Sequence, residues 1–121
     1  MFITATNDKA SILSGIINCI GSSDAKVTMI IASKRPIADI LYITKEILCL
    51  LEDTQDCDYK ILTNSTYFCV EFENGSVFEV KYYQPNARGK RADVAIIDDG
   101  IPEEDKRVLL DCCDAIDRSF V

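Results

Sequence analysis

The sequence predicts a small α/β domain in which a parallel sheet carries an added antiparallel hairpin. Three observations favour this fold class. Strand-like apolar runs alternate with helix-patterned segments in the first half of the chain, two alternating segments flank an Asn-Gly turn in the second half, and a late apolar run ends in Asp98 and Asp99. With 121 residues, 48% of them hydrophobic, we expect one domain with a buried core.

The first predicted unit is a strand followed by a helix. Residues 2–6 are short, apolar and β-branched, which indicates a strand, and residues 11–20 place apolar side chains at helical spacing. Gly21, the two serines after it and Asp24 supply the turn chemistry that should end this helix.

The second predicted unit repeats this order. Residues 27–32 form an apolar run with one threonine, as expected of a buried strand. Ser33 is placed to cap the next helix, with Pro36 in the first turn, where a missing N–H costs nothing. This helix should run to about Glu52 and bury one face, made of Ile37, Ile40, Leu41, Ile47, Leu48 and Leu51.

The next segment predicts a hairpin, preceded by a short strand at residues 59–63. A three-residue loop at Asn74, Gly75 and Ser76 aligns the apolar side chains on one face and requires a bulge with Gly75 at positive φ. The opposed pairs are then Phe72 with Phe78, Val70 with Val80, and Phe68 with Tyr82. The other face carries Glu71, Glu79 and Lys81 and should be exposed to water.

The last strand carries the most specific chemical signal in the chain. Residues 94–97 are fully apolar and are followed directly by Asp98 and Asp99. A buried parallel strand of this kind delivers its carboxylates to the edge of the sheet where ligands of open α/β folds bind. Gly100 should end the strand, and Pro102 should open a last helix.

The charge distribution argues against a broad nucleic-acid-binding surface. The chain has 20 acidic and 13 basic residues, a formal charge of −7, whereas phosphate contacts need clustered Lys and Arg. One local cluster, Arg88, Lys90 and Arg91, lies in a loop expected at residues 84–92. This loop is either simply solvated or an interaction loop that contacts a phosphate, a nucleotide or an acidic protein.

Cysteine usage and hydropathy indicate a cytoplasmic protein. The chain has no histidine, so a mixed Cys/His zinc site is excluded, and its six cysteines are expected to be reduced thiols. The N-terminal segment lacks the basic residues of a signal peptide, and charges interrupt the apolar stretches, so we expect no membrane association.

Taken in order, the hairpin, the basic turn and the acidic strand resemble the ATPase domain of phage terminase large subunits, the motors that package DNA into proheads. The matching residues are 70–80, read as Val-Glu-Phe-Glu-Asn-Gly-Ser-Val-Phe-Glu-Val, and 86–99, which contain an Ala-Arg-Gly turn and end in Asp-Asp where the family has Asp-Glu. The resemblance implies a small three-layer sheet of the P-loop NTPase type, abbreviated, with residues 1–121 as a single domain. The hairpin at residues 67–83 would be inserted before a Walker-B-like strand at residues 93–98.

The resemblance also implies roles for individual residues. Asp98 matches the family's magnesium-associated carboxylate, and Asp99 stands where the family has the catalytic glutamate that positions the attacking water. Lys9 is the only candidate for the phosphate-loop lysine, Ser11 is the nearest hydroxyl, and Arg88 is a candidate phosphate contact.

The phosphate loop itself departs from the family pattern. Residues 4–10 contain no glycine, although the glycines of G-x-x-x-x-G-K-[ST] let the backbone curl around phosphate oxygens. Asp8 adds a negative charge, Ala10 replaces the magnesium-binding hydroxyl, and Ser11 comes one residue late. Losing a few charge-assisted hydrogen bonds of roughly 1.5–3 kcal/mol each weakens nucleotide affinity by several powers of ten. We therefore expect neither a nucleotide nor a metal cofactor.

These features predict a terminase-like phage protein that is not an enzyme and acts through contacts with a phage or host protein, in DNA packaging or host interaction. One alternative is a weak magnesium-dependent ATPase that uses Asp98 and Asp99, binds Mg and ATP, and is completed by a partner. A second is a small nucleic-acid-binding module built on the loop of Arg88, Lys90 and Arg91. An uncovered sheet edge would lead to a homo-oligomer.

The candidate residues also have structural interpretations. Asp98 and Asp99 are more typical of caps in a strand-to-helix turn than of a metal or catalytic site, and Lys9 is more typical of an ordinary surface lysine than of a phosphate ligand. Three tyrosines, Tyr67, Tyr82 and Tyr83, fit cross-strand packing better than a platform for stacking bases.

Overall fold

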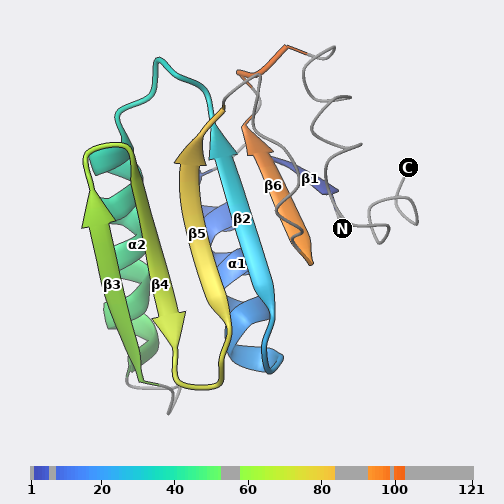
Figure 1. Ribbon diagram of the computed structural model, residues 1–121, viewed down its shortest axis with the longest axis vertical. Coiled ribbons are helices and arrows are strands. Elements are labelled where there is room, and N and C mark those ends of the chain that lie inside the picture. Colours follow the sequence, from blue (N-terminus) through green and yellow to red (C-terminus); the bar gives the residue numbers. More distant parts are fainter. Residues whose placement is uncertain (1, 6–7, 53–57, 84–92, 99, 103–121) are drawn as a thin grey trace.

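The computed structural model describes residues 2–5, 8–52, 58–83, 93–98 and 100–102 (Figure 1). The strands are β1 (Phe2–Ala5), β2 (Lys26–Ile31), β3 (Tyr59–Asn64), β4 (Tyr67–Phe72), β5 (Val77–Tyr82) and β6 (Val94–Asp98). Two helices, α1 (Asp8–Gly21) and α2 (Ile37–Glu52), follow β1 and β2. The predicted elements in the described ranges are therefore confirmed, with boundaries shifted by a few residues.

The six strands form one mixed sheet in the order β1-β6-β2-β5-β4-β3 (Figure 1). Four neighbouring strands, β1, β6, β2 and β5, run parallel, and β5, β4 and β3 pair antiparallel. The last described strand, β6, thus lies between the first two. This arrangement confirms a small α/β domain with parallel strands and an antiparallel hairpin.

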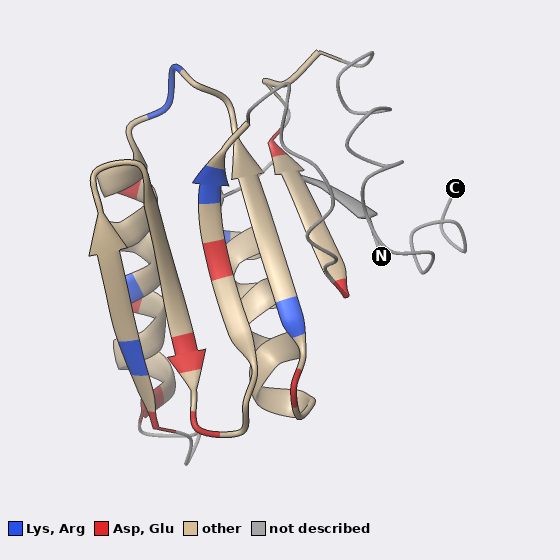
Figure 2. Cartoon of the chain, viewed as in Figure 1, with Lys and Arg blue, Asp and Glu red and all other residues tan. Residues whose placement is uncertain are grey.

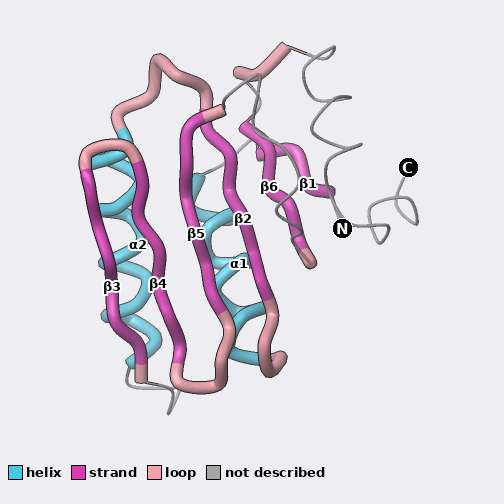
Figure 3. Tube along the Cα trace, in the orientation of Figure 1, coloured by secondary structure: helices cyan, strands magenta, loops and turns pink. Residues whose placement is uncertain are grey.

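Both described helices cover the same face of the sheet (Figure 3). The core lies between them and the sheet, and it includes Ile12 and Ile16 of α1, Ile40 and Leu48 of α2, and the strand residues Val27, Met29, Ile31, Phe68, Val70, Phe78, Val80 and Ile96. A three-layer sheet needs a helix on the other face as well. The helix expected after Pro102 lies outside the described residues, so the third layer stays a prediction.

The hairpin has the predicted bulge but not the predicted register. Gly75 has a φ of 88°, as expected. The turn, however, closes one residue earlier, because Gly75 N donates to Phe72 O at 3.0 Å and Phe72 N donates to Ser76 O at 2.9 Å. Val70 therefore faces Phe78, a shift of two residues. A shift by two keeps every side chain on its face, so the apolar residues still share the helix side.

Ser76 explains why the loop is not the predicted one. Its side chain is buried; Oγ donates to Ser22 O and accepts a hydrogen bond from Ala25 N at 3.1 Å. These bonds hold Ser76 against the α1–β2 turn, directly before β5 begins at Val77.

The helix cap predicted at Ser33 is wrong. Helix α2 begins at Ile37, four residues later. The amide of Ile37 donates to the Tyr82 hydroxyl at 3.0 Å, and that hydroxyl donates to Arg35 O at 2.6 Å. A side chain from the end of β5 thus satisfies an amide at the helix N-terminus, which a local sequence pattern cannot indicate.

The two edges of the sheet are β1 and β3. Within the described ranges β3 pairs only with β4, so its other side is an edge of the sheet. Self-association through this edge stays a prediction. Neither described helix has the length and hydropathy needed to cross a lipid bilayer.

Candidate functional site at the carboxyl edge of the sheet

The four parallel strands bring their carboxyl ends to one edge of the sheet. Strand register sets Ala5 beside Asp98 and Ile31 beside Tyr82, while β2 and β6 are paired through Ile30 and Ile97. Helices α1 and α2 begin just after β1 and β2 end, so their N-termini lie at the same edge. In open α/β sheets this is where ligands bind.

Asp98 is the acidic residue that β6 delivers to this edge, as predicted. Only 4% of its surface is exposed. Its Oδ2 accepts a hydrogen bond from Ala32 N at 2.9 Å, and its Oδ1 accepts from Gly100 N and from Arg35 Nη1, both at 3.2 Å. The carboxylate therefore joins the end of β6 to the end of β2 and to the β2–α2 loop.

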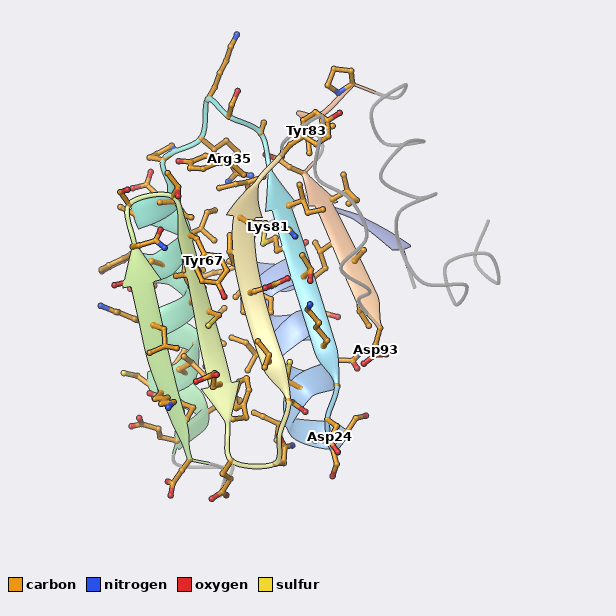
Figure 4. All side chains as sticks on the ribbon, viewed as in Figure 1. Asp24, Arg35, Tyr67, Lys81, Tyr83 and Asp93 are labelled. Atoms are coloured by element: carbon orange, nitrogen blue, oxygen red, sulfur yellow. The ribbon has the colours of Figure 1, made fainter. Side chains whose placement is uncertain are left out.

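Arg35 completes this arrangement from the β2–α2 loop (Figure 4). Its guanidinium pairs with Asp98, and its carbonyl oxygen accepts from the Tyr82 hydroxyl that also binds the first amide of α2. One chain of polar contacts thus links β6, the loop and β5. Arg35 was not predicted from the sequence, because nothing in its local pattern distinguishes it from a solvated loop arginine.

Two of the predicted phosphate-binding residues, Lys9 and Ser11, lie in the first turns of α1. Residues 6–7, which precede that helix, lie outside the described part of the chain. β1 ends at Ala5 and α1 begins at Asp8, so two residues connect them. Lys9 is exposed and lines a surface hollow together with residues of α2, among them Tyr42, Lys45 and Glu46. Ser11 is buried, with 8% of its surface exposed.

Several predicted site residues lie outside the described part of the chain. These are Asp99, Arg88, Lys90 and Arg91. Tyr83, the described residue before the basic loop, donates its N–H to Ile31 O at 2.9 Å, at the edge that carries Asp98. A contribution of this loop to the site stays a prediction. Within the described ranges no three Cys, Asp or Glu side chains are arranged to hold a metal ion.

A second polar cluster lies on the sheet face opposite the helices, and it corrects the prediction that Glu79 is exposed. Glu79 is 6% exposed and its Oε1 accepts from Thr28 Oγ1 at 2.9 Å. The ammonium groups of Lys26 and Lys81 lie 3.8 Å and 3.9 Å from the same oxygen. Parallel pairing of β2 with β5 sets Thr28 directly beside Glu79. The one threonine in an apolar run was the available signal for this cluster.

Two residues of β4, Tyr67 and Cys69, lie beside this cluster. Burial raises the pKa of Tyr67, and a hydrogen bond with Cys69 and the negative charges of Glu79 and Glu71 raise it further. The Cys69 thiol is itself buried. The cluster thus satisfies a charge inside the sheet.

No family model, curated protein or solved structure matches this chain.

Proposed function

We propose that this chain is a terminase-like phage protein with a degenerate nucleotide site, which acts through protein contacts and not through hydrolysis. The proposal joins the sequence resemblance to the contacts of Asp98. In an ATPase of that family the corresponding carboxylate serves a magnesium ion. Here the guanidinium of Arg35 supplies the positive charge, and two backbone amides supply further donors.

The occupied carboxylate is the observation that carries the proposal. Both oxygens of Asp98 already accept hydrogen bonds from the chain itself, at 2.9–3.2 Å. A magnesium ion would have to approach a carboxylate that is 4% exposed and whose oxygens already accept three hydrogen bonds, and it would still need further oxygen ligands. The structural interpretation of Asp98, a residue that joins strand ends, is therefore the better supported one.

The short connection after β1 supports the same conclusion. A phosphate loop needs several backbone N–H groups that curl around an anion, and glycines allow that curl. Two residues between Ala5 and Asp8 leave little chain for it. Lys9 lies beside α2, in the hollow with Tyr42 and Lys45.

The decisive experiment is a thermal-shift and calorimetric titration of the full chain with Mg-ATP, Mg-GTP and a short DNA duplex. A Kd of about 10 μM at about 1 mM nucleotide would stabilise the fold by about 2.7 kcal/mol. For a domain of this size that is a rise in Tm of roughly 10 °C, which is easily measured. We expect no shift with either nucleotide.

Lys9→Ala and Lys45→Ala make a matched pair for this titration, because both lysines are exposed and line the same hollow. Nucleotide binding at nanomolar to micromolar Kd that is lost in Lys9→Ala and kept in Lys45→Ala contradicts the proposal. Binding to DNA alone, falling steeply with salt, would instead favour the nucleic-acid-binding alternative.

A second candidate is a weak magnesium-dependent NTPase that a partner protein completes. The convergence of four carboxyl strand ends and two helix N-termini beside Asp98 favours it, since this geometry suits nucleotides in many α/β proteins. The side chain of Arg35 is 29% exposed, so a partner can reach the ion pair. This candidate requires turnover that appears only with the partner and disappears in Asp98→Asn.

A further inference from the structure

Strand β3 leaves one row of backbone groups without a neighbouring strand. In the described ranges it pairs only with β4, and the strand order of the sheet ends with it (Figure 1). Glu73 N donates to Asp58 O at 2.9 Å, so these two residues form a hydrogen-bonded pair in line with the β3–β4 register. Such pairs recur at every second residue of an antiparallel ladder. The N–H and C=O groups of Tyr59, Ile61 and Thr63 therefore point away from β4.

Strand β3 also lacks the features by which edge strands usually prevent the addition of a further strand. All six of its residues pair with β4 in an unbroken register, and it contains no proline or glycine. Its one charge, on Lys60, lies 3.4 Å from Glu71 of the same hairpin. Bulges, prolines and uncompensated charges are the common protections of an edge. The β3 edge is thus regular enough to accept another strand.

An exposed apolar side chain lies on this edge. Leu62 is 46% exposed, and no other large hydrophobic residue of the described strands is as exposed. Tyr59 and Ile61 pack against the core on the helix side of the sheet, so Leu62 lies on the opposite face by alternation. A strand beside β3 would cover Leu62 best with an apolar residue on that same face.

An acidic hollow lies beside the start of β3. Its volume is about 420 Å³, and its charged residues, Asp58, Lys60, Glu71 and Glu73, are three acids and one base with a sum of −2. Figure 2 shows acidic positions gathered where β3 begins and β4 ends. Asp58 and Leu62 are four residues apart, so they share a face of the strand. A strand added here is therefore favoured if it carries a lysine or an arginine beside Asp58.

We propose that the β3 edge binds an extended segment of a partner protein, which adds a strand to the sheet and carries a basic and an apolar residue four positions apart. In this mode of recognition main-chain hydrogen bonds supply affinity and alternate side chains supply specificity. The inference goes beyond the proposed function, because three strands separate β3 from β6, which carries Asp98. It gives the protein contacts of that function a surface, but it does not depend on the state of the nucleotide site.

A second copy of the chain fits this edge less well than such a segment. A two-fold antiparallel pair that uses the outward groups of all three residues in both copies is centred on Ile61. It sets Asp58 opposite Asn64 and Lys60 opposite Leu62. Neither the acidic hollow nor the exposed leucine then meets the type of residue that it favours.

The test uses two synthetic octapeptides rich in threonine, one with a lysine four positions before a valine and the other with the reverse order. The two orders cover both strand directions. Titrated into the ¹⁵N-labelled full chain up to about 2 mM, one of them should bind with a Kd of about 100 μM, as suits a contact much smaller than a standard interface. The amide signals of Tyr59, Ile61 and Thr63 should move most. Glutamate in place of the lysine should weaken binding at least about fivefold.

Thr63→Pro and Thr63→Val form a matched pair at one exposed position. Proline removes an outward N–H and spares the hydrogen bonds to β4, so the fold should persist while peptide binding falls at least about tenfold. Valine keeps that N–H, and its variant should bind the peptide as the wild type does. Both variants should keep the wild-type circular dichroism.

Several results would overturn the inference. They are no binding of either peptide at about 2 mM, binding that Thr63→Pro leaves intact, and signal changes in the wild type that lie away from β3, a readout that holds even if Thr63→Pro does not fold. Self-association that Thr63→Pro abolishes, in a chain that binds neither peptide, also overturns it and assigns the edge to a second copy. The nucleotide titration is independent of all these results, so the proposed function stands or fails separately.

Discussion

Replacing Asp98 with asparagine separates a carboxylate that joins strand ends from one kept for a ligand. Asparagine has nearly the same shape, but it removes the charge and offers one acceptor oxygen instead of two. In the wild type Oδ2 binds Ala32 N, and Oδ1 binds Gly100 N and the Arg35 guanidinium. An asparagine oxygen turned toward Ala32 leaves its NH₂ group facing two other donors.

The structure gives the expected size of the loss. Two charge-assisted hydrogen bonds disappear, each worth roughly 1.5–3 kcal/mol when buried. The contact with Arg35 is worth less than this, because that side chain is 29% exposed and water screens the pair. We expect Asp98→Asn to lower the free energy of unfolding by about 3 kcal/mol, which lowers Tm by roughly 10 °C in a domain of this size.

Urea unfolding of four proteins measures this value and assigns it. The wild type, Asp98→Asn, Arg35→Met and the double variant form a cycle, whose coupling energy should be about 1–2 kcal/mol. Functional carboxylates held ready for a ligand often cost stability, so neutralising one raises Tm. An unchanged or raised Tm in Asp98→Asn, measured without magnesium, would therefore refute the structural role that we assign to this residue.

Three further predictions concern single side chains. Tyr82→Phe removes the hydroxyl that binds the first amide of α2 and should cost about 1–2 kcal/mol, with faster amide exchange in that turn. Gly75→Ala should lower the free energy of unfolding in urea by about 1–3 kcal/mol, because φ is 88° and the new Cβ would lie 2.0 Å from Asp24 Oδ1. Gly21→Ala is the control and should be tolerated, because its Cβ meets nothing within 4 Å. Burial, together with a hydrogen bond to a carboxylate, raises the pKa of Tyr59 from 10.0 to about 12. The unfolded chain then loses this proton first, so stability falls as pH rises from 10 toward 12, and Tyr59→Phe should flatten that slope. An unchanged slope in Tyr59→Phe contradicts the assignment.

Much of the fold could be predicted from the sequence because its apolar periodicities are strong. The run at residues 94–97 has no polar interruption, and β6 is buried throughout between β1 and β2. The hairpin register was less accessible. The apolar pattern shows which face of the sheet each hairpin residue occupies. It does not fix the register, because sliding one strand by two residues leaves every side chain on the same face. The choice between registers was made by Ser76, through contacts with residues more than 50 positions away.

Of the residues that form the site, only Asp98 could be predicted from the sequence. Asp98 follows from an apolar strand that stops at a carboxylate, a local pattern. Its partners Ala32, Arg35 and Gly100 depend on β2 and β6 being neighbours, which the sequence does not state. The same limitation applies to Glu79, whose burial depends on β2 and β5 being paired.

The position of β6 between β1 and β2 has a consequence for how the chain folds. Within the described ranges β1 pairs only with β6, and some ninety residues separate Ile3 from its partner Ile96. During synthesis the first strand therefore waits without a partner until nearly all of these residues have left the ribosome. Contacts between such distant parts of a chain close slowly, and strands that wait with open hydrogen-bonding edges are exposed to aggregation. Strand β1 is thus the described strand that waits longest for its partner during synthesis.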